Sequence, residues 1–534
     1  MSLESQAESM GREEIIALLQ AHQELEAYAQ DLARQVEWFK RQLFGAKSER
    51  RLFDSAGQQL TLGELFRSTS VEQPSLEVAA HRRRPPAVRE AGGNDEPLRF
   101  DPSVPVEEIE IPNPEMEGEN LDDYVVVGQK VTCRLAQRPG SYVVLRYVRT
   151  VYKRKADEMF FCPPAPSAVL EKSCADVSLL AGILIEKFRY HLPLYRQHQR
   201  LSAAGIHLGR GTLTHWVHRT GDLLEPIYQA TLDSILSSKV LAMDETPIRA
   251  GRKQQDPPHR GEMKRAYFWP LYGDRDEIAF PFATTRGSVV VREALKDYSG
   301  VLLTDGYKVY DQYAKATEGI EHAQCWSHAR RQYEKAESSD PKRVQEVLEQ
   351  IAGIYAAEAP LRTKEVSPEK TLAFRAEHVR PLVEAFFERL KEIEREQILL
   401  PSSPFRQALA YSLQREKALR VFLENPNVPL DTNHLERAIR PIAMGRRSWL
   451  FCWTEVGAKY VGIIQSLIYT CRVQGVDPYV YLVDVLQRID THPAKDVAQL
   501  TPRLWKEKFA ANPLRSDLNR KHRAIACPEA DSVL

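Results

Sequence analysis

Several features that mark secreted or membrane proteins are missing from this sequence of 534 residues. The formal net charge is zero, so binding of a nucleic acid would need local basic patches and not an overall positive field. The 7 cysteines have no paired spacing that would indicate a disulfide framework, which favours a reducing compartment. No apolar run approaches the roughly 20 residues of a membrane span, and a secretion-signal pattern is missing. We therefore expect a cytoplasmic protein without a membrane partner.

What the sequence does contain indicates several domains, because one domain takes roughly 100–200 residues. Residues 1–50 carry a heptad repeat, with Leu18, Leu25 and Leu32 at one core position. This repeat predicts a coiled coil through which copies of the chain form a homo-oligomer; the alternative is an amphipathic helix packed on its own protein. Residues 51–100 show little periodicity and contain a run of three arginines, which predicts a basic flexible linker.

A small β-module is predicted over 101–170. Its apolar and β-branched residues fall into short runs, a pattern that favours strands over helices. The expected strands are 125–127, 131–135 and 142–151, with a turn at 138–140.

A helix-turn-helix domain is predicted over 171–235. A helix over 194–204, a turn at Gly205 and a second helix from Leu208 have the order of this motif. The second helix would present small polar and basic side chains, which suit base edges in a major groove. These candidate DNA contacts are Arg210, Thr212, Thr214 and His215. Helix–glycine–helix joints also occur as plain packing units, so the structural alternative stays open.

The remaining chain reads as an α/β core with a helical insertion. Three consecutive strands, then alternating helix and strand, are the order of a ribonuclease H-like fold. The expected strands are 239–243, 265–272, 277–283, 301–304 and one near Ala323, with a helix over 289–297. The predicted domains are the first part of the core (236–330), the insertion (331–425), the second part of the core (426–475) and a C-terminal helical tail (476–534). The fold class is thus multidomain α/β.

Three carboxylates stand where a catalytic site is expected. Asp244 and Asp305 each end a predicted strand, at the open edge of a sheet where ligands gather. Glu436 follows on a helix beyond the insertion. Three such groups can hold two divalent ions about 3.5–4 Å apart for in-line phosphoryl displacement, and Mg²⁺ suits these oxygen ligands.

Each carboxylate also has a purely structural explanation. A lone aspartate can simply terminate a strand, and Glu245 competes with Asp244 because adjacent strand residues face opposite sides. Glu436 could cap its own helix together with Asn433, or pair with Arg440 one turn on. The residues alone leave these alternatives open.

Basic side chains near these carboxylates favour a phosphodiester substrate, since arginine forks onto phosphate oxygens. The candidates on the helix of Glu436 are Arg437, Arg440, Arg446 and Arg447. Before the insertion stands His322-x-x-Cys325-x-x-His328, whose three side chains would diverge where a strand passes into a helix, so zinc is not expected there. His328, Arg330 and Arg331 are instead candidates for DNA contact.

Long motifs occur in a fixed order along most of the chain. They are 42–50 (QLFGAKSER), 135–142 (LAQRPGSY), 191–197 (HLPLYRQ), 243–247 (MDETP), 304–307 (TDGY), 325–331 (CWSHARR), 433–441 (NHLERAIRP) and 445–447 (GRR). In these motifs the sequence resembles the DDE transposases of the insertion-sequence family sixty-six (IS66).

The resemblance implies a catalytic triad of Asp244, Asp305 and Glu436, with two Mg²⁺ per active site and Mn²⁺ as a substitute. It implies cleavage of DNA 3′ ends at terminal inverted repeats and their joining to target DNA, in the bacterial cytoplasm and on the nucleoid. It also implies accessory proteins of the same element. One departure is clear: family members usually carry two Cys-x-x-Cys pairs before the helix-turn-helix, whereas this region has only Cys133 and Cys162, so no structural zinc is expected.

Two alternatives to a transposase remain at this point. One is a catalytically silent DNA-binding protein derived from such an element, against which the presence of all three carboxylates argues. The other is a ribonuclease H-like nuclease that cuts without joining. The coil and the helix-turn-helix favour assembly on specific DNA ends over this second alternative.

Overall fold

The computed structural model describes residues 99–519, except 139, 253–262, 363–365, 397–399, 401, 449 and 451, together with strands β1 (Leu52–Phe53) and β2 (Gln59–Leu60). The coiled coil expected over 1–50 and nearly all of the linker expected over 51–100 lie outside these residues. The chain divides into two compact units. One unit contains Trp326–Leu423, grouped with Met1–Glu90, and we call Trp326–Leu423 the helical unit. The other contains Ala91–Cys325 and Glu424–Leu534, and we call it the main unit. The protein is mixed α/β, as predicted.

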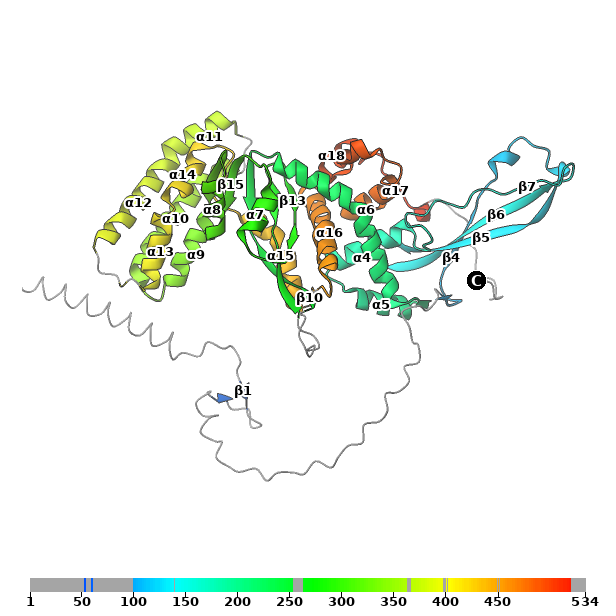
Figure 1. Cartoon of the computed structure of the whole chain (residues 1–534), viewed down its shortest axis with the longest axis horizontal. Coiled ribbons are helices and arrows are strands. Elements are labelled where there is room, and N and C mark those ends of the chain that lie inside the picture. Colours follow the sequence, from blue (N-terminus) through cyan, green and yellow to red (C-terminus); the bar gives the residue numbers. More distant parts are fainter. Residues whose placement is uncertain are drawn as a thin grey trace, which may run out of the picture. The chain divides into compact units, whose positions relative to one another are not determined.

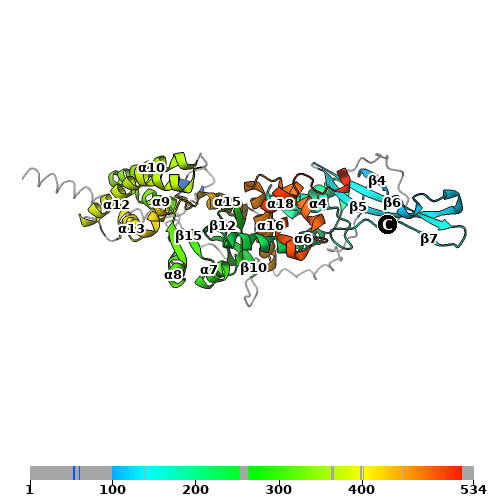
Figure 2. The same cartoon turned by 90° about the horizontal axis from the view of Figure 1, so that it is seen from above.

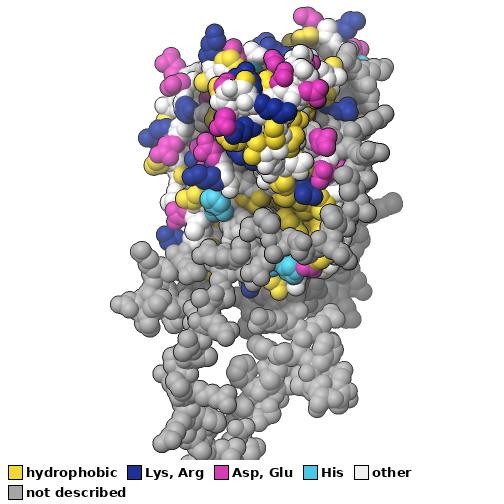
Figure 3. Space-filling view, turned by 90° about the vertical axis from the view of Figure 1, so that its right-hand side faces the viewer, with side chains coloured by type: hydrophobic (Ala, Val, Ile, Leu, Met, Phe, Trp, Pro, Cys, Tyr) yellow, Lys and Arg dark blue, Asp and Glu magenta, His cyan; other side chains and the backbone are white. Residues whose placement is uncertain are grey.

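The β-module of the main unit is built on one long hairpin. Strands β5 (Tyr124–Arg138) and β6 (Ser141–Arg154) pair antiparallel, while β4 (Val106–Glu110) runs parallel to β6 and β7 (Phe160–Phe161) adds to it. The two strands expected at 125–127 and 131–135 are one strand, because a bulge between Val126 and Gly128 absorbs the break in pattern. Figure 3 shows apolar side chains among charged ones on the described surface at this end of the chain.

Three helices follow the β-module. Helix α4 (Val177–Phe188) is almost wholly buried; α5 (Leu194–Ala203) and α6 (Arg210–Leu236) are joined by a turn in which Gly205 has φ +77°, a conformation that favours glycine. Strand β8 (Ile206–His207) in this turn pairs with β3 (Arg99–Phe100). The second helix, expected from Leu208, continues through Pro226 to Leu236, and its buried residues lie along its whole length.

A five-stranded mixed sheet forms the centre of the main unit. Its order is β13 (Glu277–Ala279), β12 (Leu271–Gly273), β9 (Val240–Met243), β15 (Gly300–Thr304) and β16 (Ile320–Gln324). Strands β9, β15 and β16 are parallel, whereas β12 runs antiparallel to β9 and β13.

A second, smaller sheet corrects the expected strand pattern. Strands β10 (Thr246–Arg252), β11 (Met263–Phe268) and β14 (Phe282–Ala283) pair separately. The single strands expected at 265–272 and 277–283 are therefore each divided between two sheets. Pro270 and Pro281 stand at the divisions, and proline cannot donate to a strand ladder.

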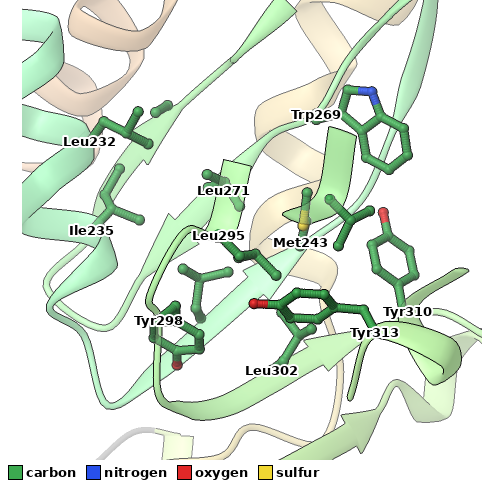
Figure 4. Close-up of a cluster of buried hydrophobic side chains, with 13 residues drawn as sticks. Leu232, Ile235, Met243, Trp269, Leu271, Leu295, Tyr298, Leu302, Tyr310 and Tyr313 are labelled. Carbon is green, nitrogen blue, oxygen red and sulfur yellow. The ribbon is translucent and has the colours of Figure 1, made fainter. Parts of the chain in front are cut away.

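Helices cover the central sheet in different ways. Helices α7 (Ser288–Leu295) and α8 (Lys308–Ala316) and the end of α6 pack on one face around Met243, Trp269 and Leu302, as Figure 4 shows. Helix α16 (Glu455–Val473) lies beside α6 (Figure 2). It closes the edge of β13, where Ser466 and Thr470 accept hydrogen bonds from the amides of Phe280 and Ile278. An edge strand covered in this way cannot pair with another chain.

The C-terminal helices complete the main unit. Helix α15 (Asn433–Ser448) packs near β10, and α17 (Pro478–Arg488) packs on α4. Asp477 caps α17, its side chain accepting from the amide of Tyr479. Helix α18 (Pro502–Lys508) follows a 3₁₀ segment, Ala494–Leu500, and the described chain ends in another, Asp517–Asn519.

The helical unit, considered by itself, surrounds one buried tryptophan. Its helices are α9 (Trp326–Ala336), α10 (Pro341–Arg362), α11 (Pro368–Phe374), a π-helical turn (Arg375–Val379), α12 (Arg380–Arg395), α13 (Pro404–Leu413) and α14 (Glu416–Glu424), coloured green to yellow in Figure 1. Trp326 contacts the rings of Phe386, Phe387 and Phe422 and donates to the carbonyl of Leu419. The regular elements described within Trp326–Leu423 are helices, and the first of them begins at Trp326.

Candidate active site

Asp244 and Asp305 lie beyond the same end of two neighbouring parallel strands. Strand β9 leads to Asp244 and β15 leads to Asp305, and the register pairs Ala242 with Leu303. Each aspartate stands two positions after its member of that pair. Because side chains alternate along a strand, both carboxylates belong to the same face of the sheet and to the same edge.

That face is the one next to helix α15. Ala242 and Leu303 line a pocket of about 270 Å³ together with His434 of α15. The two carboxylates are held locally, since Asp244 Oδ1 accepts from the amide of Glu245 at 2.7 Å and Asp305 Oδ1 accepts from that of Tyr307 at 2.8 Å. The helix that carries Glu436 therefore packs against the face to which both aspartates belong.

Contacts at both ends hold α15 against the sheet. At its start, Thr432 donates to Cys325 Sγ, directly after β16, and the ring of His434 packs edge-on against Tyr272 of β12 at 4.6 Å. At its far end, Arg446 Nη1 donates to Thr246 Oγ1 at 2.8 Å and to the carbonyl of Pro247. Glu436, half-buried in the first turn, thus lies on a helix that spans from β16 to the start of β10.

Glu245 points away from this face. Its buried side chain accepts from Tyr310 at 2.8 Å and from Arg286, on the side of the sheet covered by α8. Burial raises the pKa of Glu245 above its ordinary value, against the opposing effect of Tyr310 and Arg286. Of the two adjacent carboxylates, Glu245 therefore faces α8 and Asp244 is the one that belongs to the face of the candidate site.

Tyr310 is a buried hydrogen-bond donor to Glu245. Burial, followed by the charges of Glu245, Asp244 and Asp305, raises the pKa of its hydroxyl well above the ordinary value. Tyr310 therefore keeps its proton and stays a donor to Glu245.

The arginines predicted on α15 have different environments. Arg437, Arg440, Arg446 and Arg447 are all exposed. Arg437 donates to the carbonyl of Asn433 at 3.2 Å, while Arg446 donates to Thr246 of β10. Burial and then the neighbouring charge of Arg447 lower the pKa of Arg446. Arg446 therefore holds the helix in place, a role that the sequence did not reveal.

The other predicted DNA contacts lie on α6 and α9. On α6, Arg210, Thr214 and His215 are exposed and Thr212 is half-buried, and the guanidinium of Arg210 lies 5.7 Å above the ring of Tyr195. His328, Arg330 and Arg331 belong to α9 of the helical unit, where Arg330 pairs with Glu334 and Arg331 contacts His328.

Sequence reasoning missed several residues around Asp305. His322 lies between Asp311 and Thr304, with Nδ1 3.1 Å from the carboxylate and Nε2 2.9 Å from the hydroxyl. Arg286 and Tyr307 also lie here, with the guanidinium 4.1 Å above the ring. The sequence marked His322 only as a possible zinc ligand and Tyr307 only as part of the motif 304–307, because these contacts join separate elements.

Cysteine and histidine side chains do not gather into a metal centre in the described part of the chain. No group of three or more His, Cys, Asp or Glu side chains among these residues is arranged to hold a metal ion. Cys133 lies on β5 and Cys162 directly follows β7, and both are half-buried. Among the same residues, no helix is long and apolar enough to span a membrane.

Comparison with known families gives the decisive observation. A family model described as "Transposase IS66 family" matches residues 172–460, a stretch that includes Asp244, Asp305 and Glu436. The chain belongs to the IS66 family of transposases. Two further models of this group match, the "IS66 C-terminal element" at 466–503 and "Transposase C of IS166 homeodomain" at 31–109. The family resemblance inferred from the motifs is thus confirmed.

Similar proteins extend along nearly the whole chain. Uncharacterized protein y4hP of Sinorhizobium fredii is 29% identical over 512 residues, covering 90% of this chain and 89% of its own. Uncharacterized protein y4jD of the same organism is 27% identical over 500 residues, covering 89% and 94%. Among solved structures, the Drosophila P element transposase strand transfer complex matches with a TM-score of 0.31 and 12% identity, over 57% of this chain and 93% of that one.

Proposed function

We propose that this IS66-family protein is a DDE transposase that cleaves the 3′ ends of its element and joins them to target DNA, using Asp244, Asp305 and Glu436. The observation that carries the proposal is the shared edge: two aspartates follow adjacent parallel strands on one face, and the helix of Glu436 packs against that face. Carboxylates that come from separate elements to one sheet edge are typical of a site and not of strand termination.

The strand topology supports a ribonuclease H-like core. Numbered along the chain, β9, β12, β13, β15 and β16 give the spatial order 3-2-1-4-5, with the first, fourth and fifth strands parallel. Three consecutive strands followed by alternating helix and strand were the expected order. The helical unit would then be the insertion between Asp305 and Glu436.

The type of donor suits magnesium, although the three carboxylates are not gathered into a finished metal site among the described residues. Carboxylate oxygens are the hard ligands that Mg²⁺ or Mn²⁺ accepts, and Asp244, Asp305 and Glu436 would hold two such ions. When bound, the ions would lower the pKa of the attacking hydroxyl and stabilise the leaving oxygen. The protein's own part is to hold the phosphodiester at this edge, for which exposed arginines such as Arg437 and Arg440 supply forked donors.

Binding of DNA by α6 completes the proposal. Exposed Arg210, Thr214 and His215 near the start of this helix would contact base edges of the terminal inverted repeats. Residues 1–50 would join copies of the chain, and accessory proteins of the same element would assist.

The test is cleavage and strand transfer on DNA that carries the element's own ends, with Mg²⁺. Wild type is compared with Glu436→Gln, which keeps the shape and removes the charge, and with Glu455→Gln as a control at an ion pair with Lys264. We expect wild type and the control to cut and join, and Glu436→Gln to do neither. Equal activity in Glu436→Gln would remove Glu436 from the triad. Binding without cleavage would indicate a silent DNA-binding protein, and cleavage without joining would indicate a nuclease.

A further inference from the structure

Arg286 is held in a fixed orientation by Glu245 and Tyr307, which follow Asp244 and Asp305 in the sequence. Its Nε donates to Glu245 Oε1 at 2.9 Å and its Nη2 contacts the same oxygen, while the guanidinium plane lies 4.1 Å above the ring of Tyr307. The Tyr307 hydroxyl in turn donates to the backbone carbonyl of Arg286 at 3.0 Å. An arginine whose rotamer is fixed by a carboxylate and a ring loses little entropy when it binds a ligand.

The charge of this arginine remains available to solvent. The Glu245 side chain is 5% exposed, whereas that of Arg286 is 44% exposed. The Nε and Nη2 atoms of Arg286 donate to Glu245, which leaves the N–H donors of Nη1 for another partner. The pair is therefore asymmetric, with a buried anchor and an exposed cation.

Tyr307 connects this cation to the predicted active site. Its amide donates to Asp305 Oδ1 at 2.8 Å, so the residue that stacks under Arg286 also holds the second aspartate. Glu245 directly follows Asp244 in the sequence, and its own amide donates to Asp244 Oδ1. Glu245 and Tyr307, which hold Arg286, are thus each hydrogen-bonded through their amides to one of the two aspartates.

We propose that Arg286 binds a phosphate oxygen of the DNA backbone next to Asp305, and that Glu245 and Tyr307 are positioning residues for it. The ligand class is a phosphodiester in duplex DNA, the substrate of the proposed function on which this inference rests. Arginine recognises such oxygens through paired N–H donors, and a pre-oriented arginine does so without reorganising. Glu245 accordingly acts through Arg286 and is not a metal ligand.

The main unit contains a matched control pair. Glu277 is 1% exposed and accepts from Arg503 and from Ser234, just as Glu245 accepts from Arg286 and from Tyr310. Glu277 is paired with Gly273 at the end of the sheet opposite Asp244, since Gly273 pairs with Leu241 at the start of β9. Arg503→Ala therefore removes an equivalent ion pair away from the proposed site.

The first measurement is the salt dependence of binding to a duplex carrying the element's end, without divalent metal. The slope of log K against log salt is negative, and removing one phosphate contact reduces its magnitude by about 0.9. We expect this smaller magnitude in Arg286→Ala and an unchanged slope in Arg503→Ala. An unchanged slope in Arg286→Ala would overturn the proposal. Wild type that binds no DNA would contradict the proposed function itself, so the two failures are distinguishable.

The second measurement separates positioning from metal binding at Glu245. Arg286→Ala and Glu245→Gln should each slow Mg²⁺-dependent cleavage by roughly 10- to 100-fold, the range for removal of a hydrogen bond to a charged group. The double variant should be no slower than Arg286→Ala, because Glu245 acts only through Arg286. Additive losses, or a higher Mg²⁺ requirement in Glu245→Gln, would make Glu245 a metal ligand. Arg286→Lys, which keeps the charge but not the forked geometry, should restore the salt slope but not the full rate.

Discussion

Cys325 and Thr432, 107 positions apart, meet through two hydrogen bonds at the start of helix α15. The amide nitrogen and Oγ1 of Thr432 each lie 3.2 Å from Cys325 Sγ. Cys325 directly follows β16, and the amide of Glu436 donates to the carbonyl of Thr432. This contact therefore sets where the turn carrying Glu436 stands relative to the central sheet.

Thr432→Val should lower DNA cleavage by more than its effect on stability explains. The change keeps the shape, removes the hydroxyl donor and should cost about 0.5–1.5 kcal/mol of unfolding free energy. Thr454→Val is the control, since it removes the N-cap of α16 at a cost of roughly 1 kcal/mol without touching α15. Denaturant unfolding and cleavage rates check the prediction. Equal cleavage by the two variants would show that the Cys325 contact does not position Glu436.

Gly462→Ala should destabilise the main unit. A Cβ at this position would lie 2.3 Å from the carbonyl oxygen of Phe280, where α16 closes the sheet edge. Overpacking of this kind costs about 1–3 kcal/mol. Gly353→Ala in α10 is the opposite case: a Cβ there meets nothing within 4 Å, so the helix should gain roughly 0.5–1 kcal/mol. Chemical denaturation of both variants tests the pair, and a loss of stability in Gly353→Ala would contradict the argument.

Arg210→Ala should weaken binding to the element's ends more than binding to unrelated DNA. Arg210 is exposed at the start of α6, and removing a hydrogen bond to a base edge there would cost about 1–3 kcal/mol. Arg219→Ala on the same helix is the control, because its guanidinium donates to the carbonyl of Glu171. Fluorescence anisotropy with both DNAs gives the comparison. An equal decrease in affinity for the two DNAs would mean that Arg210 binds phosphate and does not read a base.

His218 should make the protein less stable in mild acid. Burial lowers its pKa below 6.5, and the charges of His215 and Lys187 act in the same direction, against Asp222. The unfolded chain therefore binds the proton more readily, so stability is full above pH 6.5 and is lost as the pH falls toward the folded pKa. His218→Gln should show a smaller drop in Tm between about pH 7.5 and about pH 5.5. The same drop in both proteins would exclude His218 as the cause.

Local patterns were enough to predict much of this protein. The helix–glycine–helix order predicted the turn at Gly205 before α6, because such a turn depends on neighbouring residues. The positions of Asp244 and Asp305 at strand ends also follow from the chain itself. Ordered motifs identified the family, which the comparisons confirmed.

Long-range pairing decided the rest. The register between β9 and β15 assigns both aspartates to one face, and no local pattern contains that register. Pro270 and Pro281 divide the expected strands, and the residues on either side of each proline pair in two different sheets, which a local pattern does not reveal. Arg286 meets Glu245 across 41 positions, and Arg446 meets Thr246 across 200. Such contacts arise when separate elements pack together, so their residues carry a signal only in the folded chain.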